Sequence, residues 1–203
     1  GYHIFTGLVD QVQHVLRSRS ASLLDWLGGP LPTALYLAFA AIPVAIYLTR
    51  PMPKARDGRP IPRLAGLVGT TMLLVVGAFP NPVLWQPPLV VRSLSTPVTI
   101  LAFALALYGL LHLRRNLSII PEARRLVTSG PYRHIRHPLY IAEIAVAAGV
   151  VLARPALWST VMLPVFITVQ LLRAHFEEGL LRAAFPEYAA YARRTARLVP
   201  GVY

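Results

Sequence analysis

Five long apolar runs dominate the sequence and restrict its fold more than any other feature. They lie at about residues 31–49, 64–79, 97–113, 139–153 and 156–172. Hydrophobic residues make up 55% of the chain and charged residues only 14%, against about a quarter in soluble domains. Runs of this length and composition are typical of membrane-spanning helices. We therefore predict an all-α polytopic membrane protein with five transmembrane helices.

The charged residues predict how these helices are oriented. Sixteen of the 20 basic residues lie in three segments, residues 50–63, 114–136 and 173–197. The positive-inside rule places such segments in the cytoplasm, so five spans put the N-terminus outside and the C-terminus inside. A composition rich in Ala, Leu, Arg and Pro favours a bacterial inner membrane. Because the basic residues cluster at the ends of apolar runs, the net charge of +12 does not indicate a nucleic-acid partner.

The two ends of the chain have helical patterns of their own. In residues 2–27 the apolar side chains fall on one helical face and the polar side chains on the other, which predicts an amphipathic helix lying on the bilayer. We assign residues 1–29 to this separate unit. The membrane domain then covers residues 30–203. An apolar stripe that includes Phe176 and Leu180 predicts a cytoplasmic helix after the last run, interrupted by Pro186.

Polar chemistry gathers in two cytoplasmic segments, residues 114–140 and 173–200. The first contains SGPYRHIRHPLY at 129–140, and the second contains paired glutamates. Arginine and histidine suit a carboxylate or phosphate, and a helix beginning at Pro138 offers unpaired N–H groups beside them. A carboxylate such as Glu177 suits ribose hydroxyls or a sulfonium, and tyrosines suit an adenine ring or a cation. S-adenosylmethionine combines all of these groups and is the cofactor that we predict.

Metal and thiol chemistry is not expected. The chain has no cysteine, which excludes thiol nucleophiles and cysteine-bound metals. His134 and His137 are three residues apart, but no further residues supply an obvious ligand set, so we predict no metal site.

The motif LVTSGPYRHIRHPLY, followed by EEGLLRAAFPEYAAY and a terminal VP, resembles the isoprenylcysteine carboxyl methyltransferase family. It is also similar to the related phospholipid N-methyltransferases. The resemblance covers about residues 100–200 and implies a membrane methyltransferase that uses S-adenosylmethionine. The chain departs from the family pattern at Ala142-Glu143 and at Pro186, where the family usually has glycine. These departures bear on the acceptor pocket more than on the cofactor pocket.

The resemblance also implies which residues form the site. The cofactor would be bound by the backbone before the GPY turn, by the tyrosine of that turn, by the RHPLY motif and by the paired glutamates. These residues are Arg124, Arg125, Leu126, Val127, Tyr132, Arg136, His137, Pro138, Leu139, Tyr140, Glu177 and Glu178. By position, Arg173 would lie near the acceptor.

Two further residues are candidates for catalysis. Glu143 lies inside an apolar run, where a carboxylate is costly and is a functional candidate by default. It could instead form a buried ion pair with Arg173. An amine acceptor must lose a proton, and Glu143 or His134 could accept it, whereas a carboxylate acceptor needs no base.

The expected function is methylation of a lipophilic acceptor that enters from the membrane lipid. Three alternatives remain at this stage. The first is a phospholipid N-methyltransferase, and the second is a sterol-type reductase that binds NADPH in the same pocket. The third is a non-enzymatic membrane scaffold or transporter.

Overall fold

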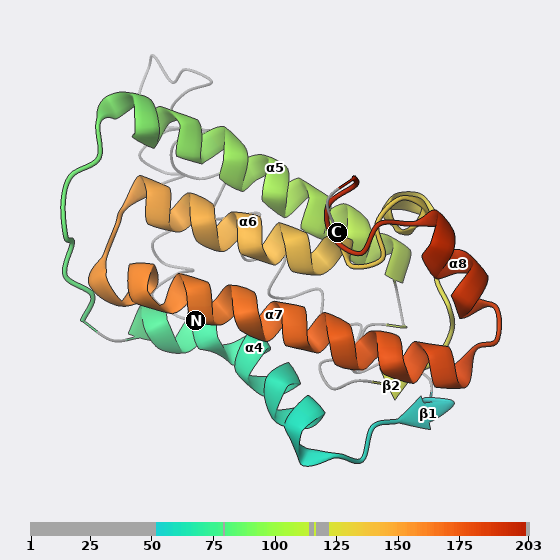
Figure 1. Ribbon diagram of the computed structural model, residues 1–203. Helices are drawn as coiled ribbons and strands as arrows, with labels where there is room; N and C mark the ends of the chain where they lie inside the picture. Colours follow the sequence, from blue (N-terminus) through green and yellow to red (C-terminus); the bar gives the residue numbers. More distant parts are fainter. Residues whose placement is uncertain (1–51, 79, 114–115, 117–121, 202–203) are drawn as a thin grey trace, which may run out of the picture.

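The computed structural model describes residues 52–78, 80–113, 116 and 122–201 (Figure 1). The α-helices in this part of the chain are α4 (Pro60–Ala78), α5 (Leu89–Leu113), α6 (Pro138–Ala153), α7 (Leu157–Ala184) and α8 (Tyr188–Arg194). The shorter elements are β1 (Ala55–Arg56), β2 (Glu122–Ala123) and the 3-10 helix η2 (Gly130–Arg133). The predicted interfacial helix, its boundary at residue 29 and the first apolar run lie outside the described residues.

The four longer helices lie side by side in the order α5, α6, α7, α4 (Figure 1). At the centre of the α5–α6 contact, Ala106 and Leu110 of α5 pack against Leu139 and Ala142 of α6. The two alanines let the helix backbones approach closely, as is common between membrane helices. The contact between α5 and α6 therefore combines small residues with leucines.

The helix boundaries follow local chemistry more than the edges of the apolar runs. Pro138 is the first residue of α6, where its missing N–H costs nothing. The fifth apolar run and the predicted tail helix form one continuous helix, α7, which ends at Ala184 immediately before Phe185-Pro186. The helical stripe that includes Phe176 and Leu180 is thus the second half of α7. The chain resumes as α8 beyond Pro186, as the spacing of Tyr188 and Tyr191 predicts.

Two helices, α5 and α7, are long and apolar enough to span a membrane in the described part of the chain. α6 is apolar but shorter. Many large apolar side chains point outward, including Leu94 and Leu101 of α5 and Val161 and Val165 of α7. Exposed apolar side chains on long apolar helices are suited to contact with lipid tails.

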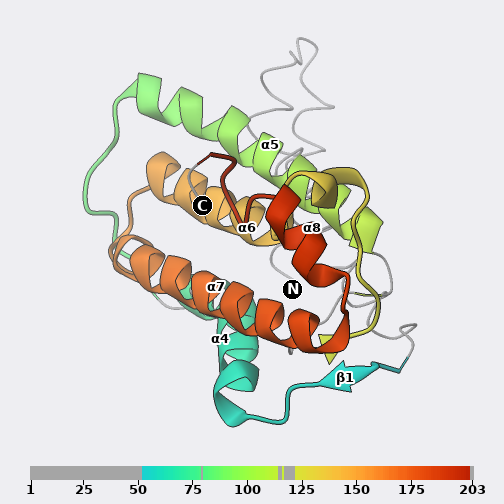
Figure 2. The ribbon, with the colours of Figure 1, turned by 45° about the vertical axis from the view of Figure 1, so that its right-hand side comes forward.

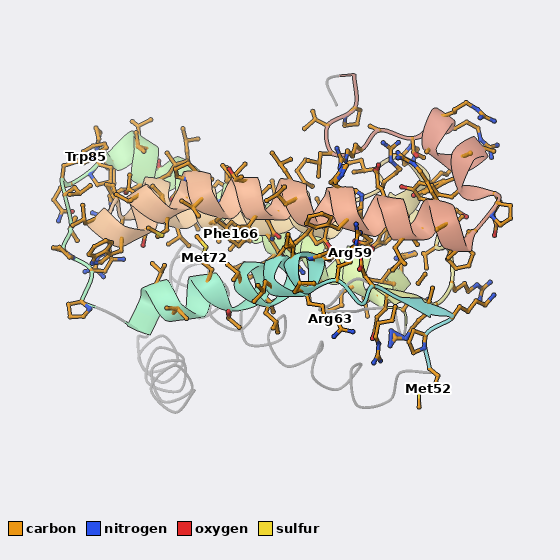
Figure 3. The ribbon with its side chains drawn as sticks, turned by 60° about the horizontal axis from the view of Figure 1, so that its bottom comes forward. Met52, Arg59, Arg63, Met72, Trp85 and Phe166 are labelled. Carbon is orange, nitrogen blue, oxygen red and sulfur yellow. The ribbon has the colours of Figure 1, made fainter. Side chains whose placement is uncertain are left out.

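One end of the bundle is closed by contacts between the loop before α5 and the start of α7. The side-chain carbonyl of Asn81 accepts a hydrogen bond from the backbone N–H of Trp158 at 2.9 Å, and its amide donates to Ser159 at 2.7 Å. The first N–H groups of a helix have no partner within the helix, so Asn81 supplies one from 77 residues away. Trp85 marks this end in Figure 3, opposite Met52.

The other end of the bundle gathers β1, β2, η2 and α8 (Figure 2). The two strands pair antiparallel, with Ala55 opposite Ala123 and Arg56 opposite Glu122. Gly130 opens η2 with a φ of +60°, a conformation that favours glycine, and a Cβ there would collide with the His112 ring. The segment that precedes α6 is thus held against the end of α5.

Candidate functional site

A cavity lies at the end of the bundle that holds β2, η2 and α8. The empty space between its walls, including the part open to solvent, is about 470 Å³. Its walls come from the loop before α6, from the second half of α7 and from α8. The lining residues are Leu113, Asn116, Glu122, Arg124, Arg125, Leu126, Val127, Tyr132, Arg136, His137, Glu177, Leu181, Tyr188 and Tyr191.

One wall depends on a buried carboxylate, Glu122. Its two oxygens accept from Arg124 at 2.6 Å and from Arg56 at 2.7 Å. Arg124 is buried, whereas the side chain of Arg56 is half exposed. The strand pair β1–β2 brings Arg56 to this position, and the backbone N–H of Lys54 extends the pairing to the carbonyl of Ala123 at 2.8 Å. The 52–56 segment therefore supports the wall that Arg124 forms.

A second buried carboxylate, Glu178, lies behind the opposite wall and holds four basic side chains. Its oxygens lie 2.8 Å from Arg136, 3.3 Å from His137, 3.1 Å from Arg182 and 3.5 Å from Arg197. Arg136 also donates to the carbonyls of Ala192 and Thr195. These contacts fix the directions in which Arg136 and His137 face the cavity.

The C-terminal segment closes this wall with backbone hydrogen bonds. The N–H groups of Arg136 and His137 donate to the carbonyls of Ala196 and Arg197 at 2.9 and 3.2 Å. The N–H of Ala196 donates in turn to the carbonyl of His134 at 3.0 Å. Segments about 60 residues apart in the chain thus form a short parallel pairing beside the cavity.

Glu177, the neighbour of Glu178, has a different environment. Its side chain is 35% exposed and lines the cavity. The hydroxyl of Tyr140 donates to it at 2.8 Å, and the ring of His137 stacks on the ring of Tyr140 with centroids 5.3 Å apart. The carboxylate of Glu177 is therefore positioned by its hydrogen bond to Tyr140 and remains accessible from the cavity.

Three of the residues that line the cavity are tyrosines, Tyr132, Tyr188 and Tyr191. Burial raises the pKa of Tyr132 well above its usual value and that of Tyr191 to about 12, so both hydroxyls are protonated at neutral pH. Tyr191 donates its hydroxyl to the carbonyl of Tyr132 at 2.7 Å. The hydroxyl of Tyr188 is buried and has no hydrogen-bond partner among the described residues.

A second polar group lies between the helices next to the cavity. Arg173 donates to Gln170 at 2.7 Å and lies 3.6 Å from Glu143, to which Gln170 also donates. The guanidinium of Arg173 is 4.7 Å from the centre of the Tyr140 ring. Through Tyr140 and its hydrogen bond to Glu177, this group adjoins the cavity.

The structure brings most of the predicted cofactor residues together. Eight of the twelve line the cavity: Arg124, Arg125, Leu126, Val127, Tyr132, Arg136, His137 and Glu177. The other four, Pro138, Leu139, Tyr140 and Glu178, lie outside its lining, although Tyr140 and Glu178 hydrogen-bond to residues that line it.

The three predicted catalytic residues do not lie together in the structure. Arg173 and Glu143 form the ion pair that the sequence left as an alternative to a catalytic role for Glu143. His134 is exposed, and its contacts to the C-terminal segment are through its backbone. The structure thus places His134 apart from the other two.

Several lining residues did not follow from the sequence. Tyr188 and Tyr191 have helical spacing, which fits packing as well as binding, and Glu122 is the only acidic residue of the 114–136 loop. That isolated acidic charge among six arginines was the one local signal for a structural ion pair. No group of three or more His, Asp or Glu side chains in the described residues is arranged to hold a metal ion.

Comparison with known proteins relates the site to a family. Residues 92–188 match the model of the phospholipid methyltransferase family. The chain is 40% identical over 76 residues to the cobalt-zinc-cadmium resistance protein CzcN of Cupriavidus metallidurans. This match covers 37% of this chain and 35% of CzcN. It is 31% identical over 80 residues to the nickel-cobalt-cadmium resistance protein NccN of Alcaligenes xylosoxydans xylosoxydans, covering 39% of this chain and 38% of NccN.

The matches cover only a little over a third of the length of these two curated relatives. The family match is longer and contains most of the cavity-lining residues, from Leu113 to Tyr188. Together with the two long apolar helices, it indicates a membrane protein similar in sequence to methyltransferases. Residues 92–188 are therefore similar to the phospholipid methyltransferase family, which includes proteins of the isoprenylcysteine carboxyl methyltransferase type.

Proposed function

We propose that this protein is an S-adenosylmethionine-dependent methyltransferase that acts on a lipophilic acceptor dissolved in the membrane. The observation that carries the proposal is the 2.8 Å hydrogen bond between Tyr140 and Glu177. It connects the polar cavity with the buried group around Arg173. A water-soluble cofactor and a lipid-borne acceptor need two neighbouring binding regions, and we assign the cofactor to the cavity and the acceptor to the region around Arg173.

The groups around the cavity fit the cofactor. Arg124, Arg125 and Arg136 suit its carboxylate, and Glu177 suits its ribose hydroxyls or its positive centre. The buried hydroxyl of Tyr188 has no partner among the described residues, which is consistent with a polar ligand in the cavity. When bound, S-adenosylmethionine supplies a methyl group activated by the adjacent sulfonium.

The residues of this chain then align the acceptor and keep water away. Arg173 is buried and lies against Tyr140, so it can hold a polar headgroup at the boundary of the two binding regions. Alignment of the reacting atoms is the main catalytic effect that such a site can supply. The apolar helices around it exclude water.

The acceptor class decides whether Glu143 has a chemical role. A carboxylate acceptor requires orientation by Arg173 but no base. An amine acceptor must lose its proton, and Glu143 is a carboxylate that lies 3.6 Å from Arg173. Replacement of Glu143 by Gln therefore separates the two classes, because it removes a base but keeps a hydrogen-bonding side chain.

The proposal is tested by ligand binding to the purified protein in detergent. We expect S-adenosylhomocysteine to bind and NADPH not to compete with it. Binding of NADPH instead would support a membrane reductase, and binding of neither would support a scaffold or transporter. Mass spectrometry of membrane lipids incubated with the protein and a deuterated methyl donor would then identify the acceptor.

A further inference from the structure

The cavity contains two tyrosines of α8 whose hydroxyl groups have different surroundings. Tyr188 and Tyr191 are three residues apart on one face of the helix, and their ring centres are 5.9 Å apart. Tyr191 is satisfied by the protein, because its hydroxyl donates to the carbonyl of Tyr132 at 2.7 Å. Tyr188 is completely buried, and its hydroxyl has no hydrogen-bond partner in the described part of the chain.

The ring of Tyr188 does not need its hydroxyl for packing. It belongs to the apolar cluster formed with Ala123, Phe185 and Tyr191, and the guanidinium of Arg182 lies 5.9 Å from its centre. A phenylalanine could make the same ring contacts. A buried hydroxyl without a partner opposes folding, because it loses its hydrogen bonds to water and gains none. Its presence in a cavity wall points to a partner that enters the cavity.

We infer that Tyr188 is a ligand-binding residue, and that its hydroxyl donates a hydrogen bond to an acceptor atom of the nucleoside–amino acid cofactor. This inference rests on the proposed function, since the cavity is the one assigned to the cofactor. It adds a residue that neither the motifs nor their spacing identified as a ligand contact.

The protonation state of Tyr188 fits this role. Burial raises its pKa well above the usual value, and the nearby Glu178 adds to the effect. The hydroxyl therefore keeps its proton at neutral pH and can act as a donor. Cofactor carboxylate oxygens, ring nitrogens and ribose oxygens are all acceptors that a neutral phenol can serve.

The test compares Tyr188→Phe with the matched variant Tyr191→Phe in the full chain, purified in detergent. Each change removes one hydroxyl and leaves a ring of the same shape. Thermal unfolding without ligand and calorimetric titration with S-adenosylhomocysteine are measured for both variants and for the wild-type protein.

We expect Tyr188→Phe to unfold at the same temperature as the wild type or higher, because no hydrogen bond within the protein is lost. Its affinity for S-adenosylhomocysteine should fall roughly tenfold, the effect of one buried hydrogen bond to a ligand. Tyr191→Phe should show a lower unfolding temperature without ligand, because the carbonyl of Tyr132 loses its donor.

Three results would overturn the inference. Unchanged affinity in Tyr188→Phe, with a wild type that binds, removes this inference alone. A loss of stability in Tyr188→Phe equal to that in Tyr191→Phe means that the hydroxyl has a partner within the protein. If the wild type itself does not bind S-adenosylhomocysteine, the proposed function fails and the inference fails with it.

Discussion

Two adjacent glutamates show how one step along a helix changes the role of a carboxylate. Successive helical residues point about 100° apart. Glu178 points into the protein and neutralises basic side chains, whereas Glu177 points into the cavity and is partly exposed. The paired motif marks the region, but the helix orientation decides which glutamate faces a ligand.

The ion pairs of Glu122 lead to a prediction for stability. Glu122→Gln should reduce the free energy of unfolding by about 3 kcal/mol, because Arg124 would lose the carboxylate that offsets its buried charge. Arg56→Ala should cost less than about 1 kcal/mol, because Arg56 is half exposed and screened by water. Thermal or denaturant unfolding in detergent would measure both. Equal losses of unfolding free energy in the two variants would mean that the buried Arg124–Glu122 pair contributes no more than the exposed one.

Arg173 carries the prediction for turnover. Arg173→Ala should keep the affinity for S-adenosylhomocysteine but lower methyl transfer by about a hundredfold, because the acceptor would no longer be aligned. Arg154→Ala, an exposed arginine after α6, serves as the control and should change neither quantity. A collapse of cofactor affinity in Arg173→Ala would instead assign Arg173 to the cofactor site.

Among the secondary-structure elements, α7 shows how a distant segment can supply a hydrogen-bond partner to the first N–H groups of a helix when the neighbouring residues in the sequence do not. The residue before α7, Ala156, has no side chain that can cap the helix. Asn81 takes this role from the preceding loop and also binds Ser159. The hairpin between α6 and α7 and the loop before α5 are thereby joined.

Replacement of Asn81 tests this connection. Asn81→Ala should lower the free energy of unfolding by about 1–2 kcal/mol, the usual effect of losing a helix cap together with a second bond. Ser159→Ala removes only one of the two bonds and should cost less. Affinity for S-adenosylhomocysteine should be unchanged in both variants, because the cavity lies at the other end of the bundle. A change in affinity would show that the two ends are coupled.

At the scale of the whole molecule, charge and apolar surface are separated along the bundle. The end near Trp85 carries few charged side chains, whereas arginines are concentrated at the end with the cavity (Figure 3). This distribution is the basis for predicting that the cavity faces the cytoplasm.

Because the chain has no cysteine, its orientation can be tested with single cysteine labels. Gly58 has free space around its Cβ position and precedes α4, and Gln86 is exposed beyond the other end of that helix. Gln86→Cys should react with a membrane-impermeant maleimide in intact cells. Gly58→Cys should react only after the cells are permeabilised. The reverse pattern would contradict the predicted orientation, and labelling from the same side would contradict α4 as a span.

The apolar runs and the motifs were sufficient to predict the helical character of the described chain and the region of the site. Long apolar runs leave the backbone no partners except its own, so they form helices, and the SGPYRHIRHPLY motif and paired glutamates fall around one cavity. The tertiary structure alone decided how the site is supported. The pairing of Arg56 with Glu122 and the contacts of Glu178 depend on side-chain directions and on segments far apart in the chain. The same is true of the Tyr188 hydroxyl, which has no hydrogen-bond partner among the residues that the structure describes. Apart from the isolated acidic charge of Glu122 among arginines, local patterns do not indicate such contacts, because their energy arises only when the helices have packed.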